Sequence, residues 1–252
     1  AGYVQLGRCR EALDCFDRMQ NEGFSPDTVT YLSVLKACGI TGSLDLGQAL
    51  AAEVNKQGLL HKNIALGTAM VDMYFRCFAV EKAREVFEHL PMQNVFSWTA
   101  LISGYVQHGF YDEALHCFSQ MKAEGLSPNN VVLLCALNAC GHSGLFNEAQ
   151  MLFGEMTETY GISPKIEHLT CMMVALGSAG HFEEALAVIR EGPPVENLAV
   201  WLALLGACRK WGNAKLGRLA FDRVIQLDNK LAAPYVLMAN LYATLGMQEE
   251  AQ

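Results

Sequence analysis

One short pattern recurs along the whole chain at nearly constant spacing. It consists of a glycine, three variable residues, a charged residue and an alanine, as in Gly7–Ala12 and Gly109–Ala114. Together with looser variants, the pattern begins at residues 7, 42, 78, 109, 144, 180, 212 and 246. The steps lie between 31 and 36 residues. A chain with this period is expected to fold as stacked copies of one supersecondary unit.

Each unit contains two segments with helical periodicity. In residues 95–129, apolar side chains of the first half recur at the spacing of one helix face. Gly109 interrupts this stripe, a second stripe begins at Ala114, and Gly125 ends it. Two short helices cannot bury their apolar stripes alone, whereas stacking on the next pair can. We therefore expect an all-α fold, a right-handed α-solenoid superhelix of helix-turn-helix repeats of 31–36 residues.

Composition restricts the classes of protein further. Hydrophobic residues make up 52% of the 252 residues, which argues against disorder. The net charge of −8 argues against coating of nucleic acid by bulk positive charge, although a local basic groove is compatible with it. The longest apolar runs, such as residues 198–206, are too short to cross a bilayer, so we expect no membrane association.

The nine cysteines do not form a disulfide framework, because their number is odd and no pair has CxxC spacing. A reducing compartment is the simpler interpretation. Cys38, Cys140 and Cys208 each follow an alanine near the end of a first helix, where a small side chain packs between helices. The chain starts without methionine and stops within a helical pattern, so we treat it as a fragment and expect any transit peptide outside it.

Helix pairs of about 34 residues occur in tetratricopeptide and pentatricopeptide arrays. Residues 94–105 (NVFSWTALISGY) followed by 112–121 (DEALHCFSQM) closely resemble a standard pentatricopeptide repeat. Residues 28–38 (TVTYLSVLKAC) resemble its long variant and residues 69–74 (AMVDMY) its short variant. This alternation resembles the plant PLS subgroup, and residues 200–208 (VWLALLGAC) resemble its C-terminal E motif.

This resemblance implies a division of the whole chain into units. They are a partial standard repeat at 1–27, a long repeat at 28–63, a short repeat at 64–94, a standard repeat at 95–129, a terminal long repeat at 130–165, a terminal short repeat at 166–197 and truncated, tetratricopeptide-like E-type motifs at 198–252.

The family that the chain resembles binds single-stranded RNA in organelles, mostly for site-specific C-to-U editing. Unpaired RNA offers base edges that helical repeats read one base per repeat. The family reads with the fifth and the last residue of each repeat. In this chain these pairs are Thr68/Asn94, Thr99/Asn129 and Thr170/Asn197. A hydroxyl and an amide each donate and accept hydrogen bonds, and the family's code pairs Thr/Asn with adenine.

The other repeats are expected to read differently. Asp27 closes the first repeat, and an aspartate there goes with G or U, but its partner lies upstream. The long repeats present Leu32 with Asn63 and Leu134 with Lys165. Leucine cannot hydrogen-bond a base, so we expect these repeats to be weak or silent readers. Because the family runs parallel to its RNA, the expected footprint from residue 28 onward is 5′-(any)-A-A-(any)-A.

The second residue of each repeat resembles the family's stacking position, where an apolar side chain lies against the base. These residues are Val29, Ala65, Phe96 and Val131. Phe96 is the strongest stacker among them. Glu167 stands at this place in the terminal short repeat and departs from the apolar pattern.

Two alternatives stand beside RNA reading. Asn94, Asn129 and Asn197 are also typical helix N-caps, and Phe96 is equally compatible with core packing. The repetition of Thr/Asn at one register favours recognition. The acidic net charge favours a tetratricopeptide-like protein-binding scaffold without RNA reading, because phosphate neutralisation normally needs a basic surface.

The sequence contains no complete catalytic motif. The family's deaminase extension uses His-x-Glu and Pro-Cys-x-x-Cys to hold zinc, and only His181 and Glu183 match half of this. We therefore expect no enzyme activity, cofactor or metal site in this chain, and no DNA binding. The tail at 198–252 is expected to recruit a deaminase domain or editing cofactors. The resemblance places the protein in a mitochondrion or chloroplast.

Overall fold

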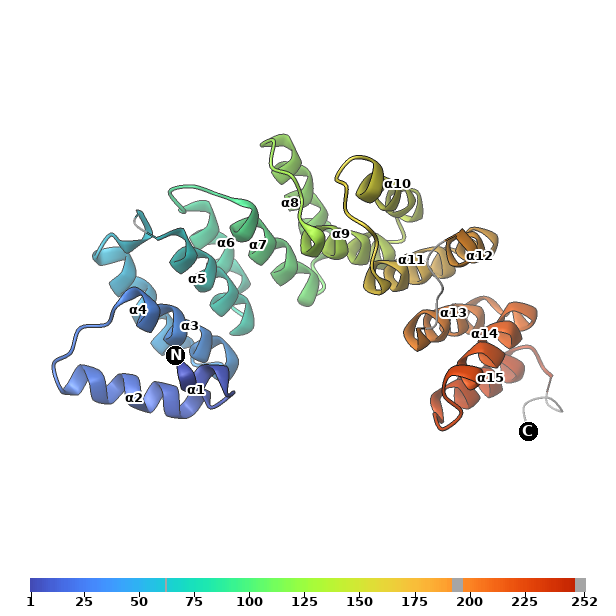
Figure 1. Ribbon diagram of the computed structural model, residues 1–252, viewed down its shortest axis with the longest axis horizontal. Coiled ribbons are helices and arrows are strands. Elements are labelled where there is room, and N and C mark those ends of the chain that lie inside the picture. The colour runs from blue at the N-terminus through green and yellow to red at the C-terminus, as the bar shows by residue number, and fades with distance from the viewer. Residues whose placement is uncertain (62, 192–196, 248–252) are drawn as a thin grey trace. The chain divides into compact units, whose positions relative to one another are not determined.

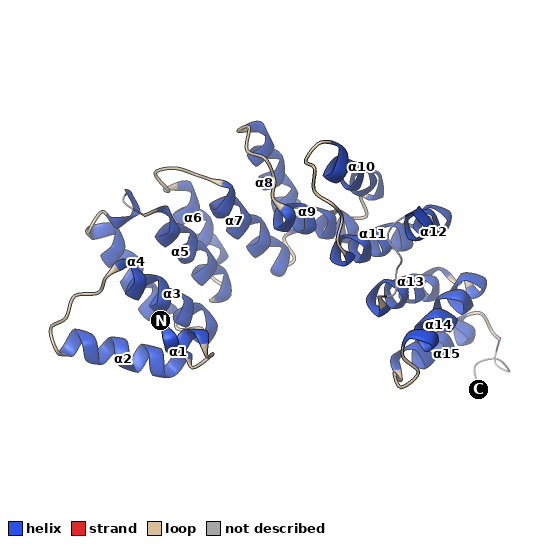
Figure 2. Cartoon of the chain, in the orientation of Figure 1, coloured by secondary structure: helices blue, strands red, loops and turns tan. Residues whose placement is uncertain are grey.

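Helices make up all the regular structure in the part of the chain that the structure describes. The computed structural model describes residues 1–61, 63–191 and 197–247. Within these ranges it contains fifteen α-helices, one 3-10 turn and no strand (Figures 1 and 2). The expected all-α fold is therefore confirmed. Residues 192–196 of the terminal short repeat and 248–252 of the E-type tail lie outside the described ranges.

The helices alternate as first and second members of successive pairs. The first helices are α3 (Thr28–Thr41), α5 (Ile64–Arg76), α7 (Val95–Gln107), α9 (Asn130–Ser143), α11 (Ile166–Ala179), α13 (Leu198–Trp211) and α15 (Ala233–Thr244). The second helices are α2 (Cys9–Asn21), α4 (Leu44–Lys56), α6 (Val80–Glu88), α8 (Tyr111–Ala123), α10 (Phe146–Glu158), α12 (Phe182–Glu191) and α14 (Ala214–Leu227). The chain opens with α1 (Gly2–Gln5), and the 3-10 turn η1 is Leu59–His61.

The first helices begin where the sequence pattern starts a new unit. Helices α3, α5, α7, α9, α11 and α13 start at residues 28, 64, 95, 130, 166 and 198. The classification of these units as long, short, standard or E-type stays a prediction, because helix positions alone do not distinguish the classes. The observed register nevertheless puts the second, fifth and last residues of each unit at or near the amino end of a first helix.

The chain divides into two compact units, Ala1–Val132 and Leu133–Gln252, and each is a stack of helix pairs. In the first unit, α5 packs between α3 and α7; in the second, α13 packs between α11 and α15. Fully buried side chains such as Leu35, Met70 and Ile102 fill the first stack. Stacking therefore buries the apolar stripe of each first helix, as expected for a solenoid of helix pairs.

The turn inside each pair uses a left-handed residue to end the first helix. Gly42 has φ of 71°, and the amide of the next residue, Ser43, donates to the carbonyl of Cys38 at 2.9 Å. Glycine adopts this conformation without steric cost, which explains the recurring glycine of the sequence pattern. Phe78 takes the same place between α5 and α6 with φ of 59° and is 83% exposed. It is the one non-glycine residue with positive φ in the described ranges.

The three cysteines that follow an alanine are packing residues. Cys38, Cys140 and Cys208 are buried in α3, α9 and α13. Burial raises the pKa of Cys38 and Cys208 to about 12 and that of Cys140 to about 11. A neutral thiol at these positions fills space between helices, in agreement with the sequence interpretation.

Candidate RNA-reading interface

The last residue of the short repeat, Asn94, caps helix α7. Its side-chain oxygen accepts hydrogen bonds from the amides of Phe96 at 2.9 Å and Ser97 at 3.0 Å. The Ser97 hydroxyl in turn accepts from the Asn94 amide at 2.9 Å. These bonds satisfy amides that have no partner inside the helix and fix the rotamer of Asn94.

The same capping role occurs at the other predicted reading asparagines. The side-chain oxygen of Asn129 accepts from the amides of Val131 and Val132, at 3.0 Å and 2.9 Å. That of Asn197 accepts from the amide of Ala199 at 2.8 Å. The capping interpretation of these residues is therefore correct. Capping occupies the oxygen of the side chain and leaves its NH₂ group to other partners, so it does not exclude base reading.

The predicted reading threonines share one geometry. The hydroxyls of Thr68 and Thr170 donate to the carbonyls of Ile64 and Ile166, at 3.4 Å and 2.9 Å. Thr99 donates in the same way to Val95, one helical turn earlier. Each threonine therefore uses its own proton on the helix backbone and keeps acceptor capacity on its oxygen.

Thr99 and Asn129 are joined directly, although 30 residues separate them. The side-chain nitrogen of Asn129 donates to the Thr99 oxygen at 3.0 Å. After the intramolecular bonds are counted, the pair still offers one acceptor lone pair on Thr99 and one N–H on Asn129. Adenine presents a donor and an acceptor side by side, its amino group and N1, so the free groups of this pair match that edge.

A surface cavity of about 550 Å³ lies between α5 and α7, which belong to neighbouring repeats. We call it the reading cavity. It is lined by Ile64, Ala65, Thr68, Ala69, Asp72, Asn94, Phe96, Thr99 and Ala100. Five of these nine residues are predicted reading or stacking residues, and they come from both sides of the boundary between the short and standard repeats. The cavity thus collects the polar groups predicted to read bases, together with apolar surface, at one place.

The predicted stacking residues are exposed apolar side chains at helix starts. Phe96 is 72% exposed, Val29 is 58% exposed and Val131 is 46% exposed, and Ala65 is also exposed. Core packing of Phe96 is therefore excluded. An aromatic ring this exposed beside hydrogen-bonding groups is a platform on which a base can stack.

The first repeat supplies a smaller site of its own. Asp27 caps α3 by accepting from the Thr30 amide at 2.8 Å and the Thr30 hydroxyl at 2.6 Å. These hydrogen bonds, the hydroxyl bond first, lower the pKa of the Asp27 carboxyl. Asp27 and Val29 line a cavity of about 260 Å³ that α1, α2 and α3 border. A carboxylate that stays ionised accepts hydrogen bonds only, so it suits a base that presents an N–H.

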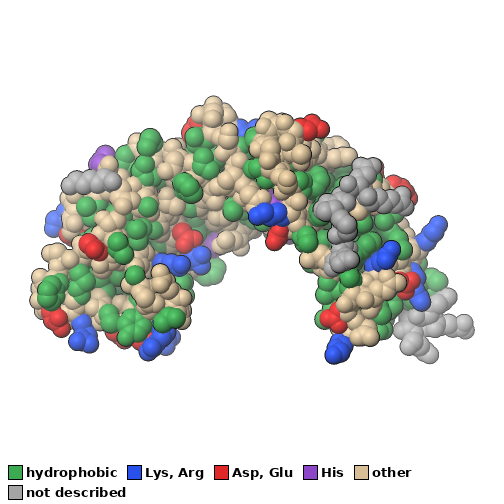
Figure 3. Space-filling model, in the orientation of Figure 1, with side chains coloured by type: hydrophobic (Ala, Val, Ile, Leu, Met, Phe, Trp, Pro, Cys, Tyr) green, Lys and Arg blue, Asp and Glu red, His purple; other side chains and the backbone are tan. Residues whose placement is uncertain are grey.

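Charge near the reading cavity is mixed. Asp72 lines the cavity, and its carboxylate pairs with Arg76 at 2.8 Å, one turn further along α5. On the face of the molecule shown in Figure 3, basic and acidic side chains are interspersed. Asp72 is the one charged side chain among the lining residues of the reading cavity, so the lining itself is not basic.

Four lining residues of the reading cavity escaped the sequence interpretation, namely Ile64, Ala69, Asp72 and Ala100. Ile64 and Asp72 lie one turn before and one turn after Thr68, so helical spacing from the reading residue could have found them. Ala69 and Ala100 follow reading threonines directly, and only the way α5 packs against α7 brings them to this surface.

The remaining predicted positions lie apart from the reading cavity. Leu32 and Leu134, the fifth residues of the long repeats, are half-buried on α3 and α9. Asn63 caps α5 by accepting from the Ala65 amide at 3.0 Å. At Lys165 the backbone amide donates to the buried ring of His168 at 3.0 Å, and Glu167 is exposed.

The half motif for a deaminase forms ordinary helix contacts. The ring of His181 lies 3.2 Å from a Glu184 carboxylate oxygen and stacks on Phe146 with ring centroids 4.0 Å apart, while Glu183 is exposed. Among the described residues, no three His, Cys, Asp or Glu side chains gather in a group that could hold a metal ion.

Over residues 1–61, 63–191 and 197–247, none of the helices combines the length and the apolar character that a bilayer crossing needs.

The stacked helix pairs and the recurrent polar pair at their amino ends define a modular helical repeat protein. Comparison with known protein families shows to which family of repeat proteins the chain belongs. Residues 1–39 and 93–140 match the PPR repeat family, and residues 132–158 and 167–191 match the PPR repeat. The chain belongs to the pentatricopeptide repeat family.

Relatives in Arabidopsis thaliana match the chain over nearly its whole length. Pentatricopeptide repeat-containing protein At4g16470 is 40% identical over 100% of this chain and 50% of its own length. Pentatricopeptide repeat-containing protein At4g19191, mitochondrial, is 38% identical over 98% of this chain and 38% of its own length. The chain thus spans half or less of these relatives.

Solved structures show the same fold. The pentatricopeptide repeat protein PPR10 in complex with an 18-nt psaJ RNA element has a TM-score of 0.74 at 17% identity, over 97% of this chain and 36% of PPR10. The pentatricopeptide repeat protein PPR10 from maize has a TM-score of 0.62 at 20% identity, over 95% of this chain and 35% of PPR10.

Proposed function

We propose that this chain is a sequence-selective reader of single-stranded RNA, in which the Thr/Asn pairs of the short and standard repeats each select adenine. The reading cavity between α5 and α7 carries the proposal, because it gathers Thr68, Asn94, Thr99 and the exposed ring of Phe96 at one surface. Its size of about 550 Å³ suits a group as large as one nucleobase.

Each component of the cavity has a definite task in this function. The ring of Phe96 stacks on a base and contributes about 1–3 kcal/mol whatever the base is. The acceptor on Thr99 and the free N–H of Asn129 then test the hydrogen-bonding edge of that base. Uracil presents a carbonyl oxygen where adenine presents an amino group, so it leaves the Thr99 acceptor unsatisfied.

Two of the Thr/Asn pairs lie in adjacent repeats, and one long repeat separates them from the third pair. Together the three pairs predict the footprint 5′-(any)-A-A-(any)-A. Fluorescence anisotropy at low salt tests it, with a short RNA carrying A-A-(any)-A and the same RNA carrying U at those three places. Tighter binding of the adenine strand supports the register and the reading residues together. Equal binding of both strands would support RNA binding but refute the predicted adenine preference.

A protein-binding scaffold is the competing function, and the net charge of −8 favours it. If neither RNA binds, adding the upstream repeats of the intact protein separates the two functions. Binding that appears with more repeats indicates too short an array, whereas binding that stays absent favours the scaffold.

The task in the cell that we propose for the intact protein is to specify C-to-U editing sites in a mitochondrial or chloroplast transcript. In this proposal the PLS-type repeats select the site, and the E-type tail from residue 198 recruits a deaminase domain or editing cofactors. A variant truncated after residue 197 should keep the RNA preference measured by anisotropy and lose editing of the target transcript. Retained editing by the truncated variant would refute the role of the tail.

A further inference from the structure

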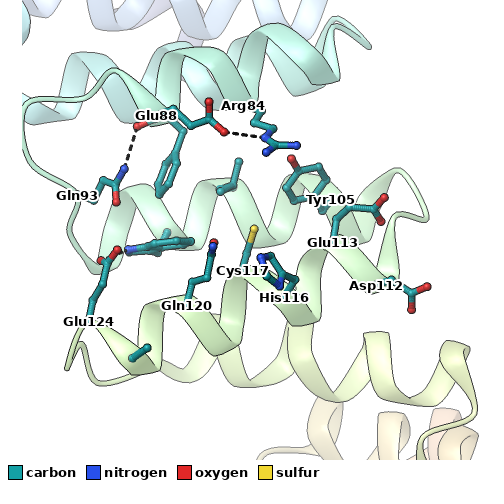
Figure 4. Close-up of a pocket in the computed structure, with 14 residues that line it drawn as sticks. Arg84, Glu88, Gln93, Tyr105, Asp112, Glu113, His116, Cys117, Gln120 and Glu124 are labelled. Carbon is teal, nitrogen blue, oxygen red and sulfur yellow. Dashed lines mark hydrogen bonds and ion pairs between the residues drawn. The ribbon is translucent and has the colours of Figure 1, made fainter.

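The reading cavity shares helix α7 with a second surface cavity, and the two differ in what they leave accessible. The second cavity, of about 640 Å³, lies among α6, α7 and α8 (Figure 4). Its floor consists of the buried side chains of Phe87, Trp98, Leu101 and Tyr105. On its wall, Arg84 is engaged by Glu88 at 2.8 Å (Figure 4). The reading cavity, in contrast, leaves a ring and a carboxylate exposed, those of Phe96 and Asp72.

The carboxylate of Asp72 has the wrong sign for a surface that attracts RNA. It is the one charged side chain in the lining of the reading cavity, and RNA phosphates are negative as well. A carboxylate there lowers the affinity for any single strand. Its ion pair with Arg76 joins two exposed side chains of one helix, and such pairs contribute little to stability. Neither RNA affinity nor helix stability therefore explains a carboxylate at this place.

One oxygen of the Asp72 carboxylate is open to a ligand. The Nε–H of Arg76 donates to Oδ2 at 2.8 Å, which holds the carboxylate in one orientation. The other oxygen, Oδ1, accepts no hydrogen bond within residues 1–61, 63–191 and 197–247. The side chain of Asp72 is 46% exposed. Asp72 thus presents an oriented acceptor to the reading cavity.

This acceptor lies where an adenine has a hydrogen bond still to make. Thr68 and Asp72 are one helical turn apart on the same face of α5, and both line the reading cavity. The amino group of adenine carries two N–H bonds. In the proposed function, the Thr68 oxygen accepts one of them, while the NH₂ group of Asn94 donates to ring atom N1. The second N–H, on the side of N7, needs a further acceptor, because an unsatisfied donor is costly.

We propose that Asp72 is a third specificity-determining residue of the short repeat, whose Oδ1 accepts the second N–H of the adenine amino group. Guanine and uracil carry a carbonyl oxygen in place of that amino group, and a carboxylate repels it. Asp72 thereby selects bases with an amino group, adenine and cytosine, over guanine and uracil. The inference rests on the proposed function, because it requires a base in the reading cavity.

The three repeats with a Thr/Asn pair differ at this position, so the chain contains its own comparison. One turn after the reading threonine stand Asp72 in the short repeat, Ser103 in the standard repeat and Val174 in the terminal short repeat. The hydroxyl of Ser103 is uncharged and donates to the carbonyl of Ala100 at 3.2 Å. Valine has no acceptor. Guanine should therefore be rejected most strongly at the first adenine of A-A-(any)-A, which the short repeat reads.

The test is fluorescence anisotropy at low salt with the A-A-(any)-A strand and with strands in which guanine replaces one of the adenines. Guanine is a purine and stacks on Phe96 as adenine does, so the difference in affinity reports the hydrogen-bonding edge. The protein variant is Asp72→Asn, which keeps the size of the side chain and removes its charge. The matched control is Asp45→Asn, in the first turn of α4 and outside the lining of the reading cavity. Both variants change the net charge equally.

For the unmodified chain, the ratio of adenine to guanine affinity at the first place should exceed the ratios at the other two by about tenfold, the effect of one hydrogen bond to a charged group. Asp72→Asn should lower the first ratio by about tenfold and leave the other two unchanged, which also shows that the variant is folded. Asp45→Asn should leave all the ratios unchanged.

The outcomes separate this inference from the proposed function. If the unmodified chain prefers adenine over uracil, but Asp72→Asn leaves the first guanine ratio unchanged, the role of Asp72 is refuted and the proposed function stands. If the unmodified chain shows no base preference at any place, both are refuted. An equal fall of the first ratio in Asp45→Asn would show that net charge, and not contact with the base, is the cause.

Discussion

An asparagine at the start of a helix performs two tasks with its two side-chain atoms. In Asn129 the oxygen caps α9, and the nitrogen donates to Thr99 of the same repeat. Capping fixes the rotamer, so in the proposed function the reading N–H is positioned before RNA arrives. Helix capping and the proposed base recognition are therefore compatible in one residue, because they use different atoms of the same side chain.

The hydroxyl of Thr99 is the most direct test of base reading. Thr99→Ala removes the acceptor and leaves the rest of α7 unchanged. Binding of the A-A-(any)-A strand should weaken by about 1–3 kcal/mol, the usual discrimination of a hydrogen-bonded base contact. Thr99→Ser retains the hydroxyl and should restore most of the affinity in the same anisotropy assay. An unchanged affinity in Thr99→Ala would remove Thr99 from the reading residues.

Exchange of Asn129 for aspartate separates capping from reading. Asn129→Asp keeps an oxygen for the amides of Val131 and Val132 but replaces the donor N–H by an acceptor. The base at this repeat should change from adenine to one that presents a ring N–H, guanine or uracil. Asn63→Asp is the matched control, because Asn63 is also a cap but belongs to a repeat with Leu32. It should leave the preference unchanged when both are measured against a set of four RNAs.

The buried thiols should be chemically silent in the native chain. Because the thiolate is the reactive species, the raised pKa of about 12 at Cys38 and Cys208 suppresses alkylation at pH 8. Exposed Cys15 should react with iodoacetamide first. Mass spectrometry of the modified sites checks this order, and all cysteines should react in denaturant. Early modification of Cys38 in the native chain would contradict the packing seen around α3.

At the scale of the element, the turn between α5 and α6 is a place where the backbone is strained. Phe78 adopts φ of 59° where other turns have glycine, and its ring makes an edge contact with His108 at a centroid distance of 5.2 Å. A bulky residue in this region costs about 1–2 kcal/mol. The contact offsets part of this cost.

Phe78→Gly should therefore raise the free energy of unfolding by about 1 kcal/mol, because it releases the strain and loses little buried area. The matched change in the next repeat is Gly109→Ala. Gly109 has φ of 78° and no atom within 4 Å of an added Cβ, so its cost is the backbone alone. This variant should lower the free energy of unfolding by about 1 kcal/mol. Thermal melts followed by circular dichroism measure both, and a loss of stability in Phe78→Gly would refute the strain.

At the scale of the whole molecule, the chain is acidic although we propose that it binds a polyanion. If recognition rests on base reading at three repeats, few phosphates are neutralised. The logarithm of affinity should then fall with the logarithm of salt with a slope on the order of −2, about 0.7 for each phosphate contacted on a single strand. Anisotropy titrations between 50 and 200 mM salt measure this slope. A much steeper slope without base preference would indicate binding by charge alone.

The sequence by itself determined the period, the helix pairs and the residues at each helix start. These features depend on local rules, namely helical periodicity, glycine at left-handed turns and asparagine at caps, which act within a few residues. Helices α3, α5 and α7 accordingly begin at the residues where the pattern begins a unit. The family followed from the same local pattern.

Only the tertiary structure decided which side chains meet. Thr99 contacts Asn129 because of the way one helix pair packs on the next. The same packing places Asp72 in the lining of the reading cavity. The exposure of Phe96 depends on it as well, since helical periodicity allowed either a core or a surface position. Local preferences do not encode these relations, because packing between repeats fixes them through contacts distant in sequence.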